Sequence, residues 1–306
     1  MKISAINISS ERGTVKKRVQ TAIINKDGIA GDAHAGPWHR QVTIISREAI
    51  DQFSREMNYN TQPEEIAVNV VIDNLDVEHV ALLDTIKLND AVLQVTQIGK
   101  KPHHYDSPVL QATGTNVMFE KGLFCRVISE GKIEIGHLAE HIRRPLKIKV
   151  LTLSDRVSKG VYADLSGPKI KEILDQFFQD KRWHPQIDID VIPDDTSILE
   201  TVLHQTKTEN TDLLFTTGGT GVGPRDITPD VVTAFCDKMI PGIMDHIRLK
   251  YGSDKPNALL SRSVAGVAGN TIVYTLPGSV KAVTEYMQEI LHTMEHLILM
   301  LHGIGH

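Results

Sequence analysis

A glycine-rich stretch that contains an acid is the part of the sequence whose residue types best suit chemistry. The stretch LLFTTGGTGVGPRDITPD spans residues 213–230 and begins with an apolar, strand-like run. Glycines let backbone N–H groups approach an anion because no Cβ obstructs them. Thr228 as N-cap and Pro229 after it predict a helix whose N-terminus adds partial positive charge. The sequence therefore predicts an anion cradle made by Gly218, Gly219, Gly221 and Gly223.

The spacing of these glycines excludes two familiar phosphate loops. A P-loop needs Gly-x-x-x-x-Gly-Lys-Ser/Thr, and no lysine follows Gly223. The dinucleotide fingerprint needs Gly-x-Gly-x-x-Gly, whereas Gly219 and Gly221 are followed by Gly223 and then Pro224. The alternative is a structural turn, because glycine-rich connections from a strand to a helix are common.

Two carboxylates are predicted to act at this cradle. Asp226 would repel a bare phosphate, but it becomes useful when Mg²⁺ bridges the carboxylate and the phosphate oxygens. Asp194 follows another predicted strand, and ligands of parallel sheets gather at the carboxyl ends of strands. We therefore predict Asp194 and Asp226 to be catalytic, metal-binding residues. Asp195 is expected only to stabilise the next helix, which Ser197 and Glu200 predict by their capping-box spacing.

The elements around these residues differ between the two halves of the chain. In the second half, four apolar strands alternate with helical segments, which predicts an α/β domain of three layers with a mostly parallel sheet. In the first half, eight short β-branched runs are separated by turn residues, which predicts a β-barrel. Its one clear helical pattern is SREAIDQFSREM. Pro145 and the preceding arginine pair mark the junction, so we expect a barrel over 1–142, a linker over 143–147 and the α/β domain over 148–306.

Composition excludes several function classes. A chain of 306 residues suits two domains, and its net charge of −5 argues against nucleic-acid binding. It contains no run of about 18 apolar residues, so no membrane span is expected. Two cysteines make a disulfide framework implausible, which favours a cytoplasmic location.

The second half resembles the molybdopterin adenylyltransferase family over residues 146–306. The resemblance is carried, in order, by LSDRVSKGVYADLSGPKI, IPDDTSI, TTGGTGVGPRDITPD, PGIMDHIR and ALLSRSVAGVAGNTIVYTLPGS. It implies that molybdopterin and ATP are substrates, that Mg²⁺ is a cofactor, and that the adenylyl group is transferred to the terminal phosphate of molybdopterin. It also implies a homotrimer built through the C-terminal half, and a molybdenum insertion protein or a recipient molybdoenzyme as partner.

The resemblance also assigns roles to residues of this sequence. Asp194 and Asp226 would organise Mg²⁺ and the ATP phosphates around the glycine cradle. Asp245 stands where many relatives have Glu, which shortens the reach of that acid by one methylene. Thr220 is implied to join the glycines of the cradle in holding substrate. The other positions implied to contact substrate or nucleotide are Ser154, Asp155, Arg156, Gly278 and Ser279.

The first half resembles a MOSC domain over residues 1–142. The resemblance is carried by GIAGDAHAGPWHRQVTIIS, QIGKKPHH and GLFCRVISEGKIEIGH, and it implies a β-barrel. Basic and polar side chains here are suited to binding the phosphate of a pterin. The bound pterin could be a finished molybdenum or tungsten cofactor. The candidates for this pterin-binding role are Asp32, His34, Arg40, Lys100 and Arg126.

Cysteine usage departs from the pattern expected of a sulfur-carrying MOSC domain. The region after Gly99 reads GKKPHHYDSPVLQATGTNVM and contains no cysteine. Cys125 lies in a strand-like run and is predicted to be a buried hydrophobe. The alternative is a reactive thiol whose pKa is lowered by Arg126. Two function classes thus stay open: an adenylyltransferase with an accessory barrel, and a non-catalytic cofactor-binding, carrier or sulfuration protein.

Overall fold

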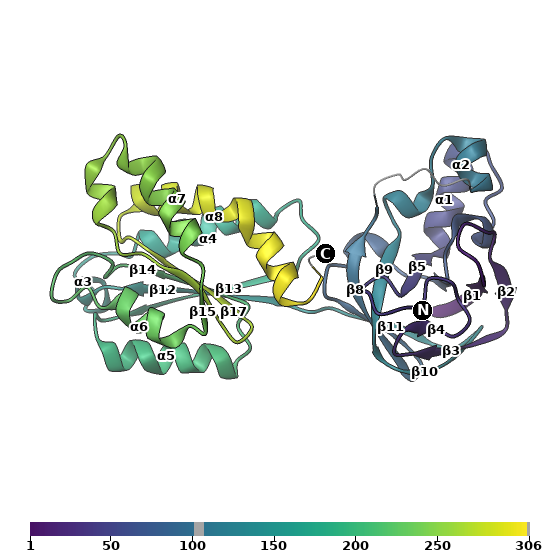
Figure 1. Ribbon diagram of the computed structural model, residues 1–306, viewed down its shortest axis with the longest axis horizontal. Coiled ribbons are helices and arrows are strands. Elements are labelled where there is room, and N and C mark those ends of the chain that lie inside the picture. The colour runs from purple at the N-terminus through teal and green to yellow at the C-terminus, as the bar shows by residue number, and fades with distance from the viewer. Residues whose placement is uncertain (101–106, 305–306) are drawn as a thin grey trace. The chain divides into compact units, whose positions relative to one another are not determined.

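The computed structural model describes residues 1–100 and 107–304 and divides the chain into two compact units (Figure 1). The first unit is Met1–Arg144 and the second is Pro145–His306. The division falls inside the stretch predicted as a linker. No helix in the described ranges is long and apolar enough to cross a lipid bilayer.

The first unit is β-rich, as predicted, and its strands are divided between two sheets. All neighbouring strands pair antiparallel except β5 and β6, which are parallel. The eight-stranded sheet has the order β11 (Ala139–Ile142), β7 (Thr85–Leu88), β8 (Ala91–Ile98), β9 (Leu123–Ser129), β5 (Val42–Ser46), β6 (Val70–Asp73), β1 (Lys2–Ile8) and β2 (Lys17–Val19). The three-stranded sheet has the order β10 (Gly131–Glu134), β3 (Thr21–Asn25) and β4 (Gly28–Ile29).

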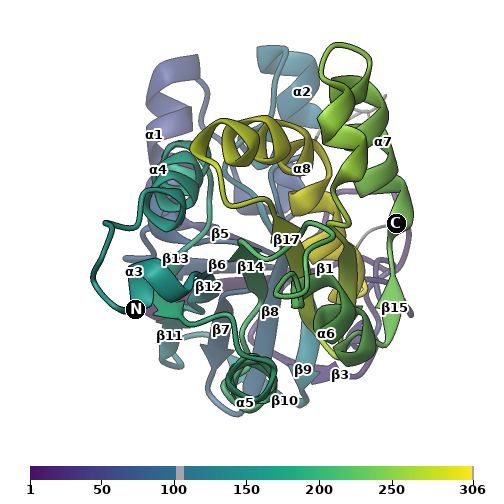
Figure 2. The ribbon, with the colours of Figure 1, turned by 90° about the vertical axis from the view of Figure 1, so that its left-hand side faces the viewer.

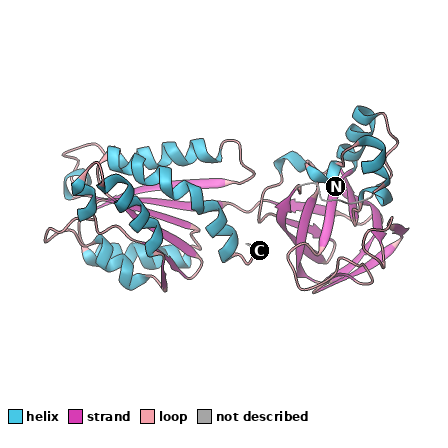
Figure 3. Cartoon of the chain, turned by 45° about the horizontal axis from the view of Figure 1, so that its top comes forward, coloured by secondary structure: helices cyan, strands magenta, loops and turns pink. Residues whose placement is uncertain are grey.

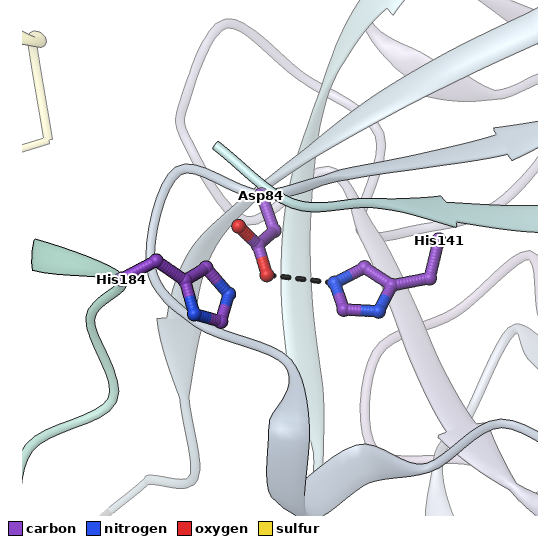
Figure 4. Close-up of side chains that lie close together, drawn as sticks. All are labelled: Asp84, His141 and His184. Carbon is purple, nitrogen blue, oxygen red and sulfur yellow. Dashed lines mark hydrogen bonds and ion pairs between the residues drawn. The ribbon is translucent and has the colours of Figure 1, made fainter. Parts of the chain in front are cut away.

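The two ends of the larger sheet meet through the start of β1. Lys2 forms an isolated antiparallel bridge with Leu138, next to β11. The Asp84 carboxylate, which precedes β7, lies 2.7 Å from Nε2 of His141 in β11 (Figure 4). It also accepts a hydrogen bond from the N–H of Ala81. The bridge between Lys2 and Leu138 brings β1 beside β11, so the larger sheet curls back on itself. The contact between Asp84 and His141 holds β11 against the turn before β7.

One long helix covers part of this sheet, as the helical pattern predicted. Helix α1 (Arg47–Met57) buries Ala49, Ile50 and Phe53 on one side. Ser46 caps it by accepting a hydrogen bond from the N–H of Ala49. The shorter helix α2 (Pro108–Thr113) and three 3-10 turns, Pro63–Ile66, Val77–His79 and Val117–Phe119, complete the unit.

The second unit contains one six-stranded sheet, which is mostly parallel as predicted. Four neighbouring strands are parallel, and two short ones extend the sheet in antiparallel pairing. The order is β13 (Pro185–Ile192), β12 (Leu146–Leu153), β14 (Leu213–Thr217), β17 (Thr271–Leu276), β16 (Ala265–Ala268) and β15 (Lys238–Met239).

Helices lie on both faces of this sheet and give three layers (Figures 2 and 3). Helices α4 (Ser166–Phe178) and α8 (Val280–Leu301) cover one face, and α5 (Thr196–Thr208) and α6 (Thr228–Phe235) cover the other. Leu199 and Val232 of the second pair pack with Leu151 and Leu214 of the sheet in a dry core. The remaining elements are α3 (Asp155–Ser158), α7 (Pro241–Gly252) and the 3-10 turn Pro256–Leu260.

Candidate functional site

The carboxyl ends of the parallel strands lie at the same level along one edge of the sheet. Leu153 of β12 pairs with Ile192 of β13, and Thr217 of β14 pairs with Leu276 of β17. Strand β12 lies between β13 and β14. The connection that leaves β12 therefore leads to one side of this strand, and the connection that leaves β13 leads to its other side. Ligands of open α/β sheets bind at this kind of switch point. The loops after these strands therefore form the candidate site.

The glycine cradle leaves β14 in a conformation that only glycine adopts readily. Gly218 has φ +103°, and a Cβ there would collide with the carbonyl oxygen of Leu153. The Thr228 hydroxyl donates a hydrogen bond to the Gly218 carbonyl at 3.0 Å. The predicted N-cap role of Thr228 is wrong, because α6 is capped by Ile227 and receives no side-chain cap bond. Thr228 instead fastens the start of the cradle to α6.

Successive backbone donors in the cradle are available to a ligand. Within residues 1–100 and 107–304, the N–H groups of Gly219, Thr220, Gly221 and Val222 donate no hydrogen bond. The helix that follows adds its own partial positive charge to the loop. A row of donors with this spacing is suited to the oxygens of a phosphate group.

Asp226 and Asp194 both border the cradle, and each uses one carboxylate oxygen to hold its place. Oδ2 of Asp226 accepts a hydrogen bond from the Gly223 N–H at 2.7 Å. Oδ2 of Asp194 accepts one from the Asp155 N–H at 3.1 Å, while its Oδ1 lies 3.8 Å from the position of a Cβ at Gly219. The second oxygens have no hydrogen-bond partner among the described residues. Two fixed carboxylates beside free N–H donors suit a divalent cation that also contacts phosphate.

Three of the other predicted residues follow β12 and β17, the strands on either side of β14. The Asp155 carboxylate accepts a hydrogen bond from Nη1 of Arg225 at 2.9 Å, which links the loop after β12 to the cradle. The Arg156 guanidinium lies over the Tyr162 ring at 5.8 Å. Gly278 packs against Gly218, with 3.5 Å between a Cβ placed on the first and Cα of the second.

The remaining predicted residues have local partners. Ser154 caps α3, and Ser279 caps α8 by accepting a hydrogen bond from the Ala282 N–H. Asp245 pairs with Arg248 on α7. Asp195 caps α5, so that helix begins two residues earlier than Ser197 and Glu200 predicted.

A cavity of about 390 Å³ opens beside the cradle. Thr220, Gly221 and Ser279 line it together with two lysines and two tyrosines. Such a recess is large enough to hold a planar organic group next to a phosphate site. The lysines and tyrosines are Lys255, Lys281, Tyr251 and Tyr286.

The first unit holds a second cavity, of about 240 Å³, with positively charged walls. Of the residues predicted to bind a pterin, it brings together His34, Arg40 and Lys100. Burial and then the charges of Arg40 and Arg126 lower the pKa of His39 beside it. Burial and the charge of Arg40 likewise lower the pKa of Lys100. Burial is the larger cause of both shifts, and the smaller contribution from the arginines reflects positive charge around the cavity, which favours an anionic ligand.

Asp32 and Arg126 are not among the residues that line this cavity. Asp32 is buried and receives hydrogen bonds from Nζ of Lys16 and Nδ2 of Asn69. Burial alone would raise its pKa, but hydrogen bonds from His34 and Lys16 outweigh it and hold the pKa well below its usual range. Arg126 donates two hydrogen bonds to the Gln94 side chain. Asp32 also accepts a hydrogen bond from the N–H of His34, which lines the cavity, so it supports the cavity wall.

Cys125 is buried in β9, as predicted, and has no solvent exposure. Burial raises its pKa far above the usual range, so the thiol is protonated at neutral pH. The neighbouring Arg126 therefore does not activate it. Residues 101–106, where the sequence lacks the cysteine expected of a sulfur carrier, lie outside the described residues.

Sequence reasoning missed four residues at the two sites. Arg12 and Trp38 line the charged cavity, and Arg12 and Arg40 both lie over the Trp38 ring. Arg225 ties the glycine loop to Asp155, and Arg262 holds a carbonyl of the loop from a distant segment. Arg225, Arg262 and Trp38 lie within motifs that carried the resemblance, so a basic or aromatic residue inside such a motif was the available signal.

Together, the fold and site define the second unit as an α/β domain with a candidate phosphate-binding site at a sheet switch point. The family model described as a probable molybdopterin binding domain matches residues 149–296, and the MOSC domain model matches residues 31–139. The molybdopterin adenylyltransferase of Helicobacter pylori is 34% identical over 159 residues, which are 52% of this chain and 89% of that protein. That of Escherichia coli is 32% identical over 160 residues, 52% of this chain and 80% of that protein.

Among solved structures, the molybdopterin biosynthesis enzyme MoaB of Thermus thermophilus has a TM-score of 0.47 and 31% identity, covering 52% of this chain and 97% of that one. The chain belongs to the molybdopterin-binding family of molybdenum-cofactor biosynthesis proteins and carries a MOSC domain in its first half.

The buried Lys16–Asp32 pair yields a stability prediction. Asp32→Asn should lower the free energy of unfolding of the first unit by about 3–5 kcal/mol, because it leaves a buried charge unpaired. Arg18→Ala, which breaks the exposed Arg18–Glu64 pair, should cost less than about 1 kcal/mol. Urea titrations of the full chain at pH 7 measure both.

The same pair predicts a pH dependence. A carboxylate with a depressed pKa contributes stability above its unfolded pKa of about 3.9, and this stability is lost as the pH falls further. The loss of unfolding free energy caused by Asp32→Asn should therefore be largest at pH 7 and become smaller below about pH 4. An equal deficit at pH 7 and pH 3 would contradict the role of the charged carboxylate.

Burial of Cys125 predicts slow thiol chemistry. In a Cys236→Ser background, Cys125 should resist an aromatic disulfide reagent in the folded chain and react fully in urea. In a Cys125→Ser background, the half-buried Cys236, whose pKa burial and Asp237 raise to about 11, should react faster. Rapid labelling of folded Cys125 would restore the sulfur-carrier alternative.

Proposed function

We propose that the second unit transfers the adenylyl group of ATP to molybdopterin, with Mg²⁺ as cofactor and pyrophosphate as the second product. The observation that carries the proposal is the row of free N–H donors flanked by two fixed carboxylates. The similarity to molybdopterin adenylyltransferases over the same residues supports it. The homotrimer, the cytoplasmic location and the insertion-protein or molybdoenzyme partner belong to the same proposal.

The reaction asks for positioning and charge neutralisation rather than a strong base. An oxygen of the molybdopterin phosphate attacks the α-phosphorus of ATP, and the bond from that phosphorus to the β-phosphate oxygen breaks. A phosphate monoester is largely dianionic at neutral pH, since its second pKa is about 6. The attacking group therefore needs no deprotonation, and alignment accounts for most of the rate gain.

Residues of the cradle supply this alignment. The free N–H groups from Gly219 to Val222 would hold phosphate oxygens, and the recess lined by Tyr251 and Lys255 would take an organic ring. Asp194 and Asp226 would hold Mg²⁺, which supplies positive charge against the negative charge of the phosphates. The Arg225–Asp155 contact would keep the loop after β12 against the cradle.

We further propose that the MOSC unit binds a phosphate-bearing pterin cofactor, with molybdenum or tungsten, by noncovalent contacts. The observation that carries this proposal is a cavity lined by Arg12, Arg40 and Lys100, together with the burial of Cys125 in a strand. Nε of Arg40 is buried without a hydrogen-bond partner among the described residues. A bound anion would satisfy this donor.

Substitution of the two acids tests the adenylyl transfer. Asp194→Asn and Asp226→Asn keep the side-chain volume but remove the charge, so turnover should fall by roughly 100- to 1,000-fold. Asp195→Asn is the matched control, because Asp195 only caps α5. Formation of adenylyl-molybdopterin is measured by chromatography at saturating Mg²⁺. Near-normal turnover in both acid variants would refute the assignment of metal-binding residues.

Removal of Arg40 tests the charged cavity. Each charge-assisted hydrogen bond contributes about 1.5–3 kcal/mol, so Arg40→Ala should weaken binding of molybdopterin by roughly tenfold to a hundredfold. Arg47→Ala on the same unit is the control, since its side chain contacts Asp73 instead. Titrations of wild type, Arg40→Ala and Arg47→Ala with molybdopterin, each fitted to two sites, separate this site from the cradle, which is the same in all three proteins. Equal affinity in both arginine variants would contradict the proposal.

A further inference from the structure

Arg262 makes more contacts with the glycine cradle than any residue predicted from the sequence. It lies between the 3-10 turn Pro256–Leu260 and β16, and its side chain is about one-third exposed. Its Nε donates a hydrogen bond to the Gly221 carbonyl at 2.7 Å, and Nη2 donates one to the Asp226 carbonyl. Its Nη1 lies 2.9 Å and 3.0 Å from the carboxylate oxygens of Asp230.

The backbone of Arg262 adds another contact to the same loop. Its N–H donates a hydrogen bond to the Thr220 carbonyl at 2.9 Å. One residue thus holds the carbonyls of Thr220, Gly221 and Asp226, and it ties them to the first turn of α6 through Asp230. These contacts run from Thr220 to the first turn of α6.

Fixing the carbonyls also fixes the donors of the cradle. A trans peptide is planar, and its C=O and N–H point in opposite directions. When the Thr220 and Gly221 carbonyls point toward Arg262, the N–H groups of Gly221 and Val222 point away from it. Those N–H groups are among the free donors that would hold phosphate. Arg262 therefore sets the direction of the donors without touching the ligand itself.

A loop with several glycines needs such a constraint. Glycine loses more conformational freedom on ordering than any other residue, so an unsupported loop populates many forms. The Asp226 carbonyl held by Arg262 also keeps the Asp226 side chain where its Oδ2 accepts the Gly223 N–H. Both the donors and the acid are thereby oriented before substrate arrives.

We propose that Arg262 is a positioning residue that holds the glycine cradle in its phosphate-binding form. This inference rests on the proposed adenylyl transfer for its effect on rate, but its effect on the loop does not depend on the reaction. The Arg262 side chain acts through the Gly221 and Asp226 carbonyls, so Arg262→Ala leaves the ligand-contacting groups present but misdirects the Val222 N–H and Asp226, while the backbone N–H of residue 262 still holds the Thr220 carbonyl.

Arg248 offers a matched control in the same part of the unit. Its Nη1 donates hydrogen bonds to the carbonyls of Ser261 and Ser263, on either side of Arg262. It makes no contact with the cradle among the described residues. Arg248→Ala therefore disturbs the same segment without releasing the loop.

The first measurement is hydrogen exchange of the full chain, read by mass spectrometry on peptides that cover residues 218–228. Arg262→Ala should speed exchange of the Gly223, Asp226 and Thr228 amides by roughly tenfold or more, because the loop opens more often. Arg248→Ala should leave these amides as in wild type. Unchanged exchange in Arg262→Ala would overturn the proposal whatever the activity of the protein.

The second measurement is the rate of adenylyl-molybdopterin formation. A displacement of about 1 Å can cost roughly 100-fold in rate, so Arg262→Ala should lower kcat by about that factor. Free guanidinium at millimolar concentration should restore part of kcat to Arg262→Ala and none to Arg248→Ala. The kcat of Arg262→Lys should lie between those of wild type and Arg262→Ala, because one ammonium group cannot reach both the Gly221 and the Asp226 carbonyl.

The outcomes separate this inference from the proposed function. If wild type forms no adenylyl-molybdopterin, the proposed function fails, and the hydrogen exchange alone decides the role of Arg262. If wild type is active and Arg262→Ala loses rate only in proportion to its unfolded fraction, with no guanidinium rescue, Arg262 is merely structural and the proposal is overturned. Thermal unfolding of Arg262→Lys, Arg262→Ala and Arg248→Ala measures that fraction.

Discussion

The in-register pairing of four parallel strands is the constraint on which the second unit depends. Because β12, β13, β14 and β17 end at the same level, their loops meet at one edge, where each contributes something different. Strand β14 leads into the glycine cradle, β13 into Asp194 and β12 into Asp155. A slip of one residue in any pair would move these groups apart by about 3.3 Å and reverse the direction of the side chains.

Opposite charges at this edge explain how an acid can lie inside a phosphate cradle. The free N–H groups and the N-terminus of α6 attract an anion, whereas Asp194 and Asp226 repel it. A divalent cation between carboxylates and phosphate removes the conflict, since it gains oxygen ligands from both sides. The charged cavity of the MOSC unit has no such conflict: none of its described lining residues is acidic, and its arginines favour an anion directly. The two candidate sites thus differ in how each would accommodate a phosphate group.

Much of this arrangement could be predicted from the sequence because it depends on short-range patterns. Apolar runs, glycine spacing and acids after strands predicted the sheet, the cradle and the placing of Asp194 and Asp226 beside it. Contacts between distant segments could not be predicted in this way. Arg262 lies 36 residues from the Asp226 carbonyl that it holds, and nothing in its own neighbourhood indicates that contact. The sequence also did not show which of several polar residues would cap a helix. Asp195 caps α5 where Ser197 was expected, and the Thr228 hydroxyl donates to the Gly218 carbonyl instead of capping α6.

The central claim is that the second unit transfers the adenylyl group and does not only bind its ligands. The most direct measurement follows ATP labelled with ³²P at the α-phosphate, mixed with the full chain, molybdopterin and Mg²⁺. The label should move to molybdopterin, with one pyrophosphate released for each label transferred, and chelation of Mg²⁺ should stop both. If molybdopterin and ATP both bind while the label stays in ATP, the account is contradicted and the chain is a cofactor-binding protein without turnover.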